Sequence, residues 1–184
     1  DIAFADGRFS VAGTDRVVSL FDVAKAAETG DRLPEQLRGR LHAAAEILVP
    51  LPAYPNGCHV AEVEIDPDTG NVEIVGYCGV DDVGTVINPL IVDGQTHGGI
   101  AQGAGQALME LCAHDPQSAQ VLAGSFMDYA MPRADLFPPF RLAFNSVPAP
   151  STPLGVKGGG EGGTTGAPPA LINAIVDALR GCGV

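Results

Sequence analysis

The sequence predicts an α+β fold in which a mixed β-sheet packs against helices. Three observations lead to this fold class. Short segments of alternating apolar and polar residues lie on either side of turn residues, which predicts β-hairpins. Two longer segments have apolar residues at helical spacing. Strands and helices follow one another without a regular βαβ order, so we do not expect a doubly wound parallel sheet.

The first 30 residues predict a hairpin followed by a helix. Residues 2–11 contain two short apolar runs around Asp6-Gly7, a dipeptide that suits a two-residue hairpin turn. Ser19 and Asp22 have the spacing of a capping pair at a helix start. We expect this helix to end at Gly30, because glycine commonly follows the last helical residue.

The middle of the chain predicts a second hairpin and a long helix. Residues 59–66 and 71–77 alternate between apolar and polar side chains, and turn residues lie between them. Residues 89–111 begin with a proline and have apolar side chains at mostly helical spacing. Several glycines in this segment would each destabilise a free helix by about 1 kcal/mol relative to alanine. We therefore expect the helix to pack against another backbone or a ligand.

One more strand and one more helix are expected near the C-terminus. Residues 140–147 have the pattern of a strand. The final helix is expected to begin at Ala167-Pro168-Pro169, because proline is favoured in the first turn of a helix. The apolar stripe of this helix consists of Leu171, Ile172, Ile175, Val176 and Leu179.

The composition excludes several classes of partner. The chain has 184 residues, enough for one domain with a buried core. It has 22 acidic and 10 basic side chains and a net charge of -12. We therefore expect no nucleic acid and no anionic membrane surface as a partner, because both repel an acidic protein. No apolar run is long enough for a transmembrane segment.

The cysteines indicate a reducing compartment. Cys58, Cys78, Cys112 and Cys182 are spaced too irregularly for a zinc site or a disulfide framework. We expect buried or half-buried thiols, no metal bound by side chains of this chain, and a cytoplasmic location. The chain begins with Asp1 and no signal peptide is recognisable, so we expect a piece of a longer polypeptide.

The strongest functional indication is a glycine-rich segment, residues 155–166, in which seven of twelve residues are glycine. Backbone without side chains can approach a ligand closely and can donate its N–H groups to it. Glu161 stands in the middle, and a carboxylate held against a ligand could accept a proton. The alternative is a flexible loop with an acidic residue near a helix start, where negative charge is favourable. The segment alone does not separate the two.

Gly158, Gly160 and Gly163 also fit the GxGxxG pattern of dinucleotide-binding proteins. That pattern requires a strand directly before the glycines and a second parallel strand after the helix. Here three prolines separate the predicted strand from the glycines, and the chain ends with the last helix. A nicotinamide-dinucleotide site is therefore not expected.

A second candidate binding segment lies within the predicted helix 89–111. Gln95 and Gln102 are seven residues apart, which places them on one face of a helix, with glycines between them. A glutamine amide both donates and accepts hydrogen bonds, which suits an amide-rich heterocycle such as a pterin. A single glutamine would indicate only a polar surface.

Five motifs occur along the chain in a fixed order: VEIDPDTG (63–70), DVGTVINP (82–89), GQTHGGIAQG (94–103), DYAMPR (128–133) and KGGGE (157–161). Together they resemble the C-terminal molybdopterin-binding region of the molybdenum hydroxylases. This family comprises xanthine dehydrogenase, aldehyde oxidoreductase and the large subunit of aerobic carbon monoxide dehydrogenase. We expect one such region over residues 1–184, with a looser match over 1–59 and the motifs in 60–184.

The resemblance implies roles for individual residues. Glu161 matches the family's active-site glutamate, the base that takes a proton from the metal-bound hydroxyl. Gln95 matches a glutamine that hydrogen-bonds the pterin. The loop beside the metal is matched by Lys157, Gly158, Gly159 and Gly160. The rest of the Gln95 motif is also expected to contact the cofactor, namely Gly98, Gly99 and Gln102.

The resemblance also implies a cofactor and partners. The cofactor is molybdopterin carrying molybdenum, expected in its cytosine dinucleotide form. The implied reaction is oxidation of an aldehyde, an N-heterocycle or carbon monoxide with oxygen derived from water. The implied partners are the N-terminal remainder of the large subunit, iron–sulfur and FAD-binding subunits or domains, and a second copy of the complex. Because the family's subunit is far longer, we expect this piece alone to be inactive and without cofactor.

Two alternatives belong to other classes. In the first, the chain is a non-catalytic assembly module whose glycines serve packing alone. A variant combining Gln95→Ala with Lys157→Ala would then fold and assemble unchanged, with no molybdenum to lose. In the second, weaker alternative, the chain belongs to a nicotinamide-dinucleotide oxidoreductase, and NAD would stabilise it against heat.

Overall fold

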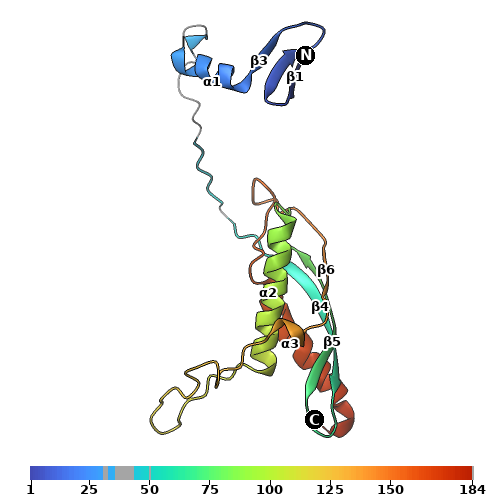
Figure 1. Cartoon of the computed structure of the whole chain (residues 1–184). Coiled ribbons are helices and arrows are strands. Elements are labelled where there is room, and N and C mark those ends of the chain that lie inside the picture. The colour runs from blue at the N-terminus through green and yellow to red at the C-terminus, as the bar shows by residue number, and fades with distance from the viewer. Residues whose placement is uncertain (31–32, 36–43, 50, 184) are drawn as a thin grey trace. The chain divides into compact units, whose positions relative to one another are not determined.

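The computed structural model describes residues 1–30, 33–35, 44–49 and 51–183 of the chain (Figure 1). The chain folds into two compact units, Asp1–Leu48 and Val49–Val184. All five motifs lie in the second unit, which therefore contains the candidate site.

The first unit is a small antiparallel sheet in the order β1-β2-β3, followed by a helix. Its elements are β1 (Ile2–Ala5), β2 (Arg8–Val11), β3 (Val17–Ser19) and α1 (Leu20–Thr29). Asp6 and Gly7 have φ angles of 49° and 71°, as a two-residue hairpin turn requires. The Ser19 hydroxyl accepts a hydrogen bond from the Asp22 N–H at 3.0 Å, and Gly30 ends α1 with φ 68°. The predicted hairpin and helix are confirmed.

The second unit contains a mixed sheet in the order β4-β5-β6, which confirms the predicted α+β fold. β4 and β5 are antiparallel, whereas β5 and β6 are parallel. The Asp66 carboxylate accepts N–H bonds from Asp68 and Thr69 in the β4–β5 turn, and these bonds lower its pKa. The elements of this unit are β4 (Asn56–Ile65), β5 (Val72–Asp82), α2 (Pro89–Leu108), η2 (Ala134–Leu136), β6 (Arg141–Phe144), α3 (Gly162–Ala178) and η3 (Arg180–Cys182).

The core of the second unit lies where α3 contacts both α2 and β4. Ile100 of α2 and Leu171 of α3 are its largest fully buried side chains. Ile100 packs with Tyr77 of β5 and Ala167 of α3, and Leu171 packs with Ile74 and Ala104. These contacts use the apolar positions that the strand and helix patterns predicted, and they hold the start of α3 beside the end of β5.

The predicted start of the last helix is wrong, because α3 begins at Gly162, five residues before Ala167. The Thr165 N–H donates to the Glu161 carbonyl at 2.9 Å and closes the first turn. The backbone at Gly163 packs so closely on α2 that an added Cβ would lie 2.5 Å from the Thr96 carbonyl oxygen. This contact between helices sets the start, and Pro168 and Pro169 lie inside the helix, where each removes a backbone donor.

Two other predicted boundaries also move. The long helix α2 ends at Leu108 instead of residue 111, since the N–H groups of Met109 and Glu110 both donate to the Gly105 carbonyl. The predicted strand 140–147 is shorter, because only Arg141–Phe144 pair with β5. The N–H groups that follow this strand bind Asp81 and Asp82 at the end of β5 instead.

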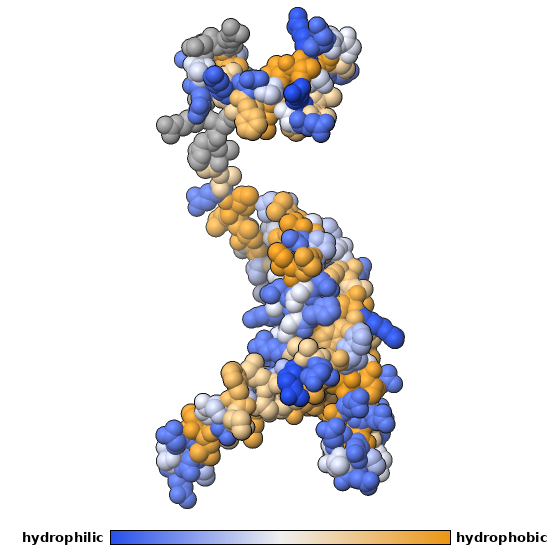
Figure 2. All heavy atoms as spheres, in the orientation of Figure 1, coloured by the Kyte–Doolittle hydropathy of each residue, from blue (hydrophilic) through white to orange (hydrophobic). Residues whose placement is uncertain are grey.

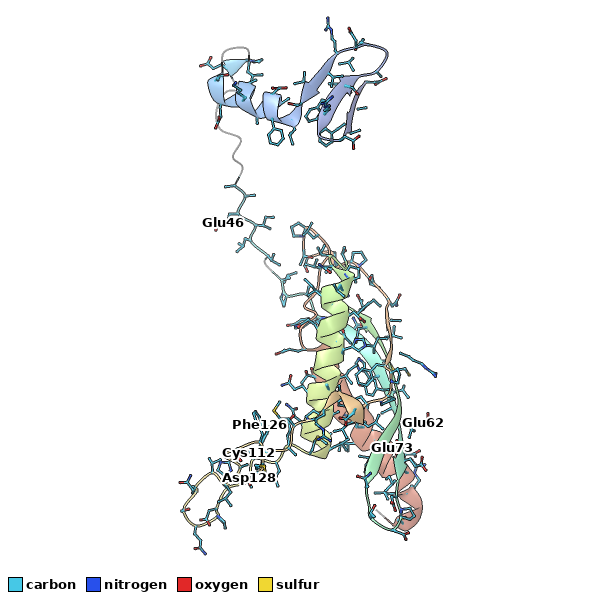
Figure 3. All side chains as sticks on the ribbon, in the orientation of Figure 1. Glu46, Glu62, Glu73, Cys112, Phe126 and Asp128 are labelled. Atoms are coloured by element: carbon cyan, nitrogen blue, oxygen red, sulfur yellow. The ribbon has the colours of Figure 1, made fainter. Side chains whose placement is uncertain are left out.

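Residues 110–131 leave the body of the second unit as an arm (Figures 1 and 3). The Tyr129 hydroxyl donates to the Glu110 carboxylate at 2.6 Å, which closes the base of the arm. Phe126 and Met127 are 82% and 93% exposed on it. Figure 2 shows hydrophobic side chains on this arm among hydrophilic ones.

The expectation of buried thiols is wrong, because all four cysteines are exposed. Cys58 and Cys78 lie on neighbouring strands, opposite Val80 and Val60, on a face of the sheet where these valines are exposed too. Cys112 lies on the arm (Figure 3). Within the described ranges, no helix is both long and apolar enough to cross a membrane.

Candidate functional site

A pocket of about 560 Å³ lies where β4, β5, the glycine loop (residues 155–161) and the first turn of α3 meet. Its lining includes His59 and Asp81 of the sheet, Glu161 of the loop, and the glycines on either side of Glu161. Thr96 of α2 also lines the pocket. Segments that are far apart in the sequence therefore enclose one cavity around the strongest motif.

The glycine loop is anchored at both ends. At its start, the Thr85 N–H donates to the Gly155 carbonyl and the Lys157 N–H donates to the Val83 carbonyl, each at 2.9 Å. At its end, the Glu161 carbonyl accepts the first helical bond of α3. Between these anchors, the N–H groups of residues 158–160 have no acceptor within the described part of the chain. They are free to donate to a ligand in the pocket.

The glycines of the loop leave room that the chain itself does not use. Among the described residues, nothing lies within 4 Å of a Cβ added at Gly158. At Gly159 and Gly160 the nearest atoms would be 3.4 and 3.7 Å away, which is ordinary contact, and none of the three has a left-handed φ. Neither packing nor backbone strain in this chain requires glycine here. A group that must approach the backbone closely does explain it.

Glu161 is exposed at the pocket and stands directly before α3. Its carboxylate makes no capping bond to the helix. No other hydrogen bond or ion pair engages this carboxylate in the portion of the chain that is described. The carboxylate is therefore available to accept a proton from a group bound in the pocket.

Gln95 is the predicted pterin contact that lies beside the loop. It projects from α2, and its Nε2 would be 3.7 Å from a Cβ added at Gly160. Gly98, one turn further along α2, has nothing within 4 Å of an added Cβ among the described residues. Both residues are exposed on α2, but neither lines the pocket.

Gly99 and Gln102 lie instead where α2 contacts α3. A Cβ added at Gly99 would lie 2.9 Å from the Thr164 backbone nitrogen. The Thr164 hydroxyl donates to the Gly99 carbonyl at 3.2 Å and is 3.4 Å from the Gln102 side-chain oxygen. Packing between the helices explains Gly99, whereas Gln102 is exposed at the edge of the same contact. Contact of either residue with a cofactor stays a prediction.

Lys157 forms a nearly buried ion pair with Asp82. Its Nζ lies 2.5 Å from Asp82 Oδ2, and the two side chains are 11% and 9% exposed. Asp82 Oδ1 accepts N–H bonds from Gly84 at 2.8 Å and Val147 at 3.1 Å. The Lys157 bond, followed by these two, lowers the pKa of Asp82 to about 2.

The sequence reasoning missed a second buried pair at the pocket, His59 and Asp81. Their side chains are 4% and 9% exposed, and His59 Nε2 lies 3.1 Å from Asp81 Oδ1. His59 Nδ1 lies 2.7 Å from the Tyr77 hydroxyl. With Nε2–H donating to the carboxylate, Nδ1 accepts from that hydroxyl. Burial, and secondarily the charge of Asp81, raises the pKa of Tyr77, which keeps the hydroxyl a donor.

A signal for this pair was present in the strand pattern. His59 and Asp81 occupy positions on the face of the β4–β5 hairpin that also carries buried Tyr77. Ionisable residues on a core-facing strand position need partners. Glycines make the space: a Cβ added at Gly166 would lie 2.8 Å from the His59 ring. Among the residues that are described, no group of three or more His, Cys, Asp or Glu could hold a metal.

The dinucleotide alternative finds no support in this geometry. β6 ends at Phe144, well before Gly158, and no strand follows α3 in the described residues. Gly163, the third glycine of the pattern, packs against α2 instead of facing the pocket's ligand space.

The fold and the pocket define a cofactor-binding domain, and comparison with known proteins identifies its family. The family model for the molybdopterin cofactor-binding domain matches residues 1–138. The chain belongs to this family, which confirms the resemblance expected from the motifs.

Individual members of the family are similar to the chain over nearly its whole length. The chain is 39% identical over 97% of its length to the nicotine 6-hydroxylase large subunit of Paenarthrobacter nicotinovorans. It is 33% identical over 97% of its length to the carbon monoxide dehydrogenase large chain of Afipia carboxidovorans. The structure of quinoline 2-oxidoreductase from Pseudomonas putida 86 matches the whole chain with a TM-score of 0.82 at 36% identity.

These relatives are much longer than the chain. It spans 22% of each of the two curated relatives and 24% of the quinoline 2-oxidoreductase chain. The chain thus corresponds to one portion of a large subunit.

Proposed function

We propose that the chain is the portion of a molybdenum hydroxylase large subunit that binds molybdopterin and supplies the catalytic base. The observation that carries this proposal is the exposed Glu161 carboxylate beside backbone that has no side chains and unused N–H donors. An assembly module would not need this combination of an available carboxylate and vacant backbone donors.

The residues of the pocket fit a bulky polar cofactor. The N–H groups of residues 158–160 would donate to it, and Gln95 would hydrogen-bond the pterin from α2. Gly98, Gly99, Gln102 and Lys157 are proposed to belong to the same binding region. The cofactor, when bound, supplies the redox centre at which the substrate is oxidised.

Glu161 is proposed as the general base. Its carboxylate accepts a proton as a water-derived oxygen is transferred to the substrate carbon. The loop glycines let the reacting group come within hydrogen-bonding distance of this carboxylate. The His59–Asp81 pair forms part of the pocket wall beside the first turn of α3, where an added Cβ at Gly162 would lie 3.9 Å from Asp81.

For the complete protein, we also propose a substrate class and partners. The names of the relatives include a nicotine hydroxylase, a quinoline oxidoreductase and a carbon monoxide dehydrogenase. We accordingly propose a small N-heterocycle, an aldehyde or carbon monoxide as substrate. The cytosine dinucleotide form of the cofactor, iron–sulfur and FAD-binding subunits or domains, a homodimeric complex and a cytoplasmic location complete the proposal.

The test is Glu161→Gln in the complete enzyme, produced with its partner chains. The amide keeps the shape of the side chain but cannot accept the proton. We expect molybdenum content to be unchanged and kcat to fall at least about 100-fold, the lower range for loss of a general base.

Glu73→Gln is the matched control, because this exposed glutamate lies on the distant part of the β4–β5 hairpin (Figure 3). Near-normal activity of Glu161→Gln would refute the base assignment. A correctly assembled wild-type complex without molybdenum would favour the assembly module instead.

A further inference from the structure

We infer that Lys157 and Asp82 are positioning residues: their buried ion pair holds the glycine loop, and with it Glu161, at the pocket. Lys157 then supports the cofactor through Asp82 instead of contacting it. This inference rests on the proposed function for what the loop binds, but not for how the loop is held.

The direction of the Lys157 side chain supports this role. Lys157 is absent from the lining of the pocket that contains residues 158–162. It lines a separate hollow of about 220 Å³, together with Val83, Thr85 and residues at the start of α2. Its ammonium group meets Asp82 at 2.5 Å, and little of either side chain reaches solvent. The positive charge of Lys157 is therefore already paired with the Asp82 carboxylate within the chain.

Asp82 contacts four segments through one carboxylate. Oδ1 binds the N–H of Gly84, just after β5, and the N–H of Val147, in the segment leading to the loop. Oδ2 binds Lys157 within the loop, and the Asn56 side-chain amide of β4 lies 3.5 Å from it. A buried carboxylate with this many donors is costly to disturb, because each donor would lose its acceptor.

The composition of the loop explains why an anchor of this kind is needed. Lys157 is the last residue before Glu161 that has a side chain, since residues 158–160 are all glycine. Three glycines cannot fix their own conformation by side-chain packing, and glycine loses more freedom on ordering than any other residue. The position of Glu161 thus depends on the fixed points on either side. These are the first turn of α3 on one side and, on the other, the Lys157–Asp82 pair together with the backbone bonds of Gly155 and Lys157.

The test is a double-mutant cycle in the complete large subunit with its partner chains, using Asp82→Asn, Lys157→Met and their combination. Asparagine keeps an oxygen for the Gly84 and Val147 N–H groups, and methionine keeps the length of lysine. The first readout is hydrogen exchange of the Thr85 and Lys157 amides, whose bonds to the Gly155 and Val83 carbonyls anchor the start of the loop, and the second is molybdenum content. We expect each single variant to accelerate exchange about tenfold or more and to lower molybdenum content, with no further change in the combination.

Lys157→Arg should restore most of the protection, because it keeps a cation for Asp82. The matched control is Asp177→Asn with Arg180→Met, an ion pair between α3 and η3 whose side chains are 72% and 84% exposed, and it should change neither readout.

Independent effects would overturn the inference. If Lys157→Met lowered molybdenum content by the same factor with and without Asp82→Asn, lysine would contact the cofactor itself. If Asp82→Asn does not fold, Lys157→Met alone decides: a folded variant with unchanged exchange would refute the pair as an anchor. A wild-type complex without molybdenum would refute the proposed function, while the exchange readout would still report on the pair.

Discussion

Two segments of this protein, α2 and the glycine loop, are both rich in glycine, but the physical reason for the glycines differs between them. In α2, a Cβ added at Gly99 or Gly103 would lie 2.8–2.9 Å from atoms of α3, so the contact between the helices requires glycine. In the glycine loop, Cβ atoms at residues 158–160 would meet no described atom closer than 3.4 Å. The first set is explained inside the chain. The second set has no such reason within the described part of the chain, and this is the physical basis for proposing that the cofactor contacts the loop.

The largest loss of stability is expected from a substitution that disrupts the contact between α2 and α3. Gly103→Ala places its Cβ 2.8 Å from Pro168 and 3.0 Å from the Thr164 carbonyl oxygen. Such overpacking costs about 1–3 kcal/mol, which exceeds the gain of about 1 kcal/mol from replacing a helical glycine. We expect the free energy of unfolding, measured by urea denaturation of the whole chain, to fall.

Gly98→Ala is the control in the same helix, because nothing described lies within 4 Å of the added Cβ. It should raise the free energy of unfolding by up to about 1 kcal/mol. Changes of the same sign in both variants would contradict the contact between the helices as the reason for Gly103.

The next prediction concerns pH, which should affect the anchor of the glycine loop but not the glycine contact between α2 and α3. Lys157, then the Gly84 and Val147 N–H groups, lower the pKa of Asp82 to about 2 from an ordinary 3.8. A lowered folded-state pKa means that this carboxylate stabilises the fold fully above about pH 4, and that the contribution is lost as pH falls through about 2. The α2–α3 glycine contact contains no ionisable group and should not respond.

Urea unfolding between pH 5 and pH 2 measures this contribution. We expect the wild type to lose more stability over this range than Asp82→Asn, which carries no titrating group at this position. Parallel curves for the two proteins would contradict the assigned role of the ion pair.

The smallest expected effect on stability is in the loop. Gly158→Ala meets no atom within 4 Å in the described structure and requires no left-handed φ. We expect the free energy of unfolding of the cofactor-free chain to change by no more than about 0.5 kcal/mol. A loss as large as that expected for Gly103→Ala would mean that packing inside the chain explains the loop glycines too.

The predictability of the fold depends on how local the deciding contacts are. The β4–β5 hairpin and α1 follow from alternation, turn residues and capping, which operate over a few neighbouring residues. The start of α3 does not, because it depends on Gly163 meeting α2. The burial of Cys58 and Cys78 was wrongly predicted for a related reason, because strand alternation does not show which face of the sheet the helices cover.

The same distinction applies to the site. Glu161, Gln95 and the loop glycines could be proposed as site residues from the sequence because they form short motifs. The partner of Lys157 was not, because Asp82 lies 75 residues away in the sequence. The His59–Asp81 contact depends on the register of the hairpin, which shifts between Glu62 and Val63. Lysine in a glycine-rich motif suggests a ligand, whereas the fold provides it with an internal partner.

The most direct test of the loop as the cofactor's contact surface is the molybdenum content of the complete large subunit, measured by plasma mass spectrometry. Wild type and Gly158→Leu should be compared after production with the cofactor pathway and partner chains. We predict stoichiometric molybdenum in the wild type and a large loss in Gly158→Leu, at an unchanged melting temperature of the cofactor-free chain. Equal molybdenum in both proteins, or none in a correctly assembled wild type, would contradict the account.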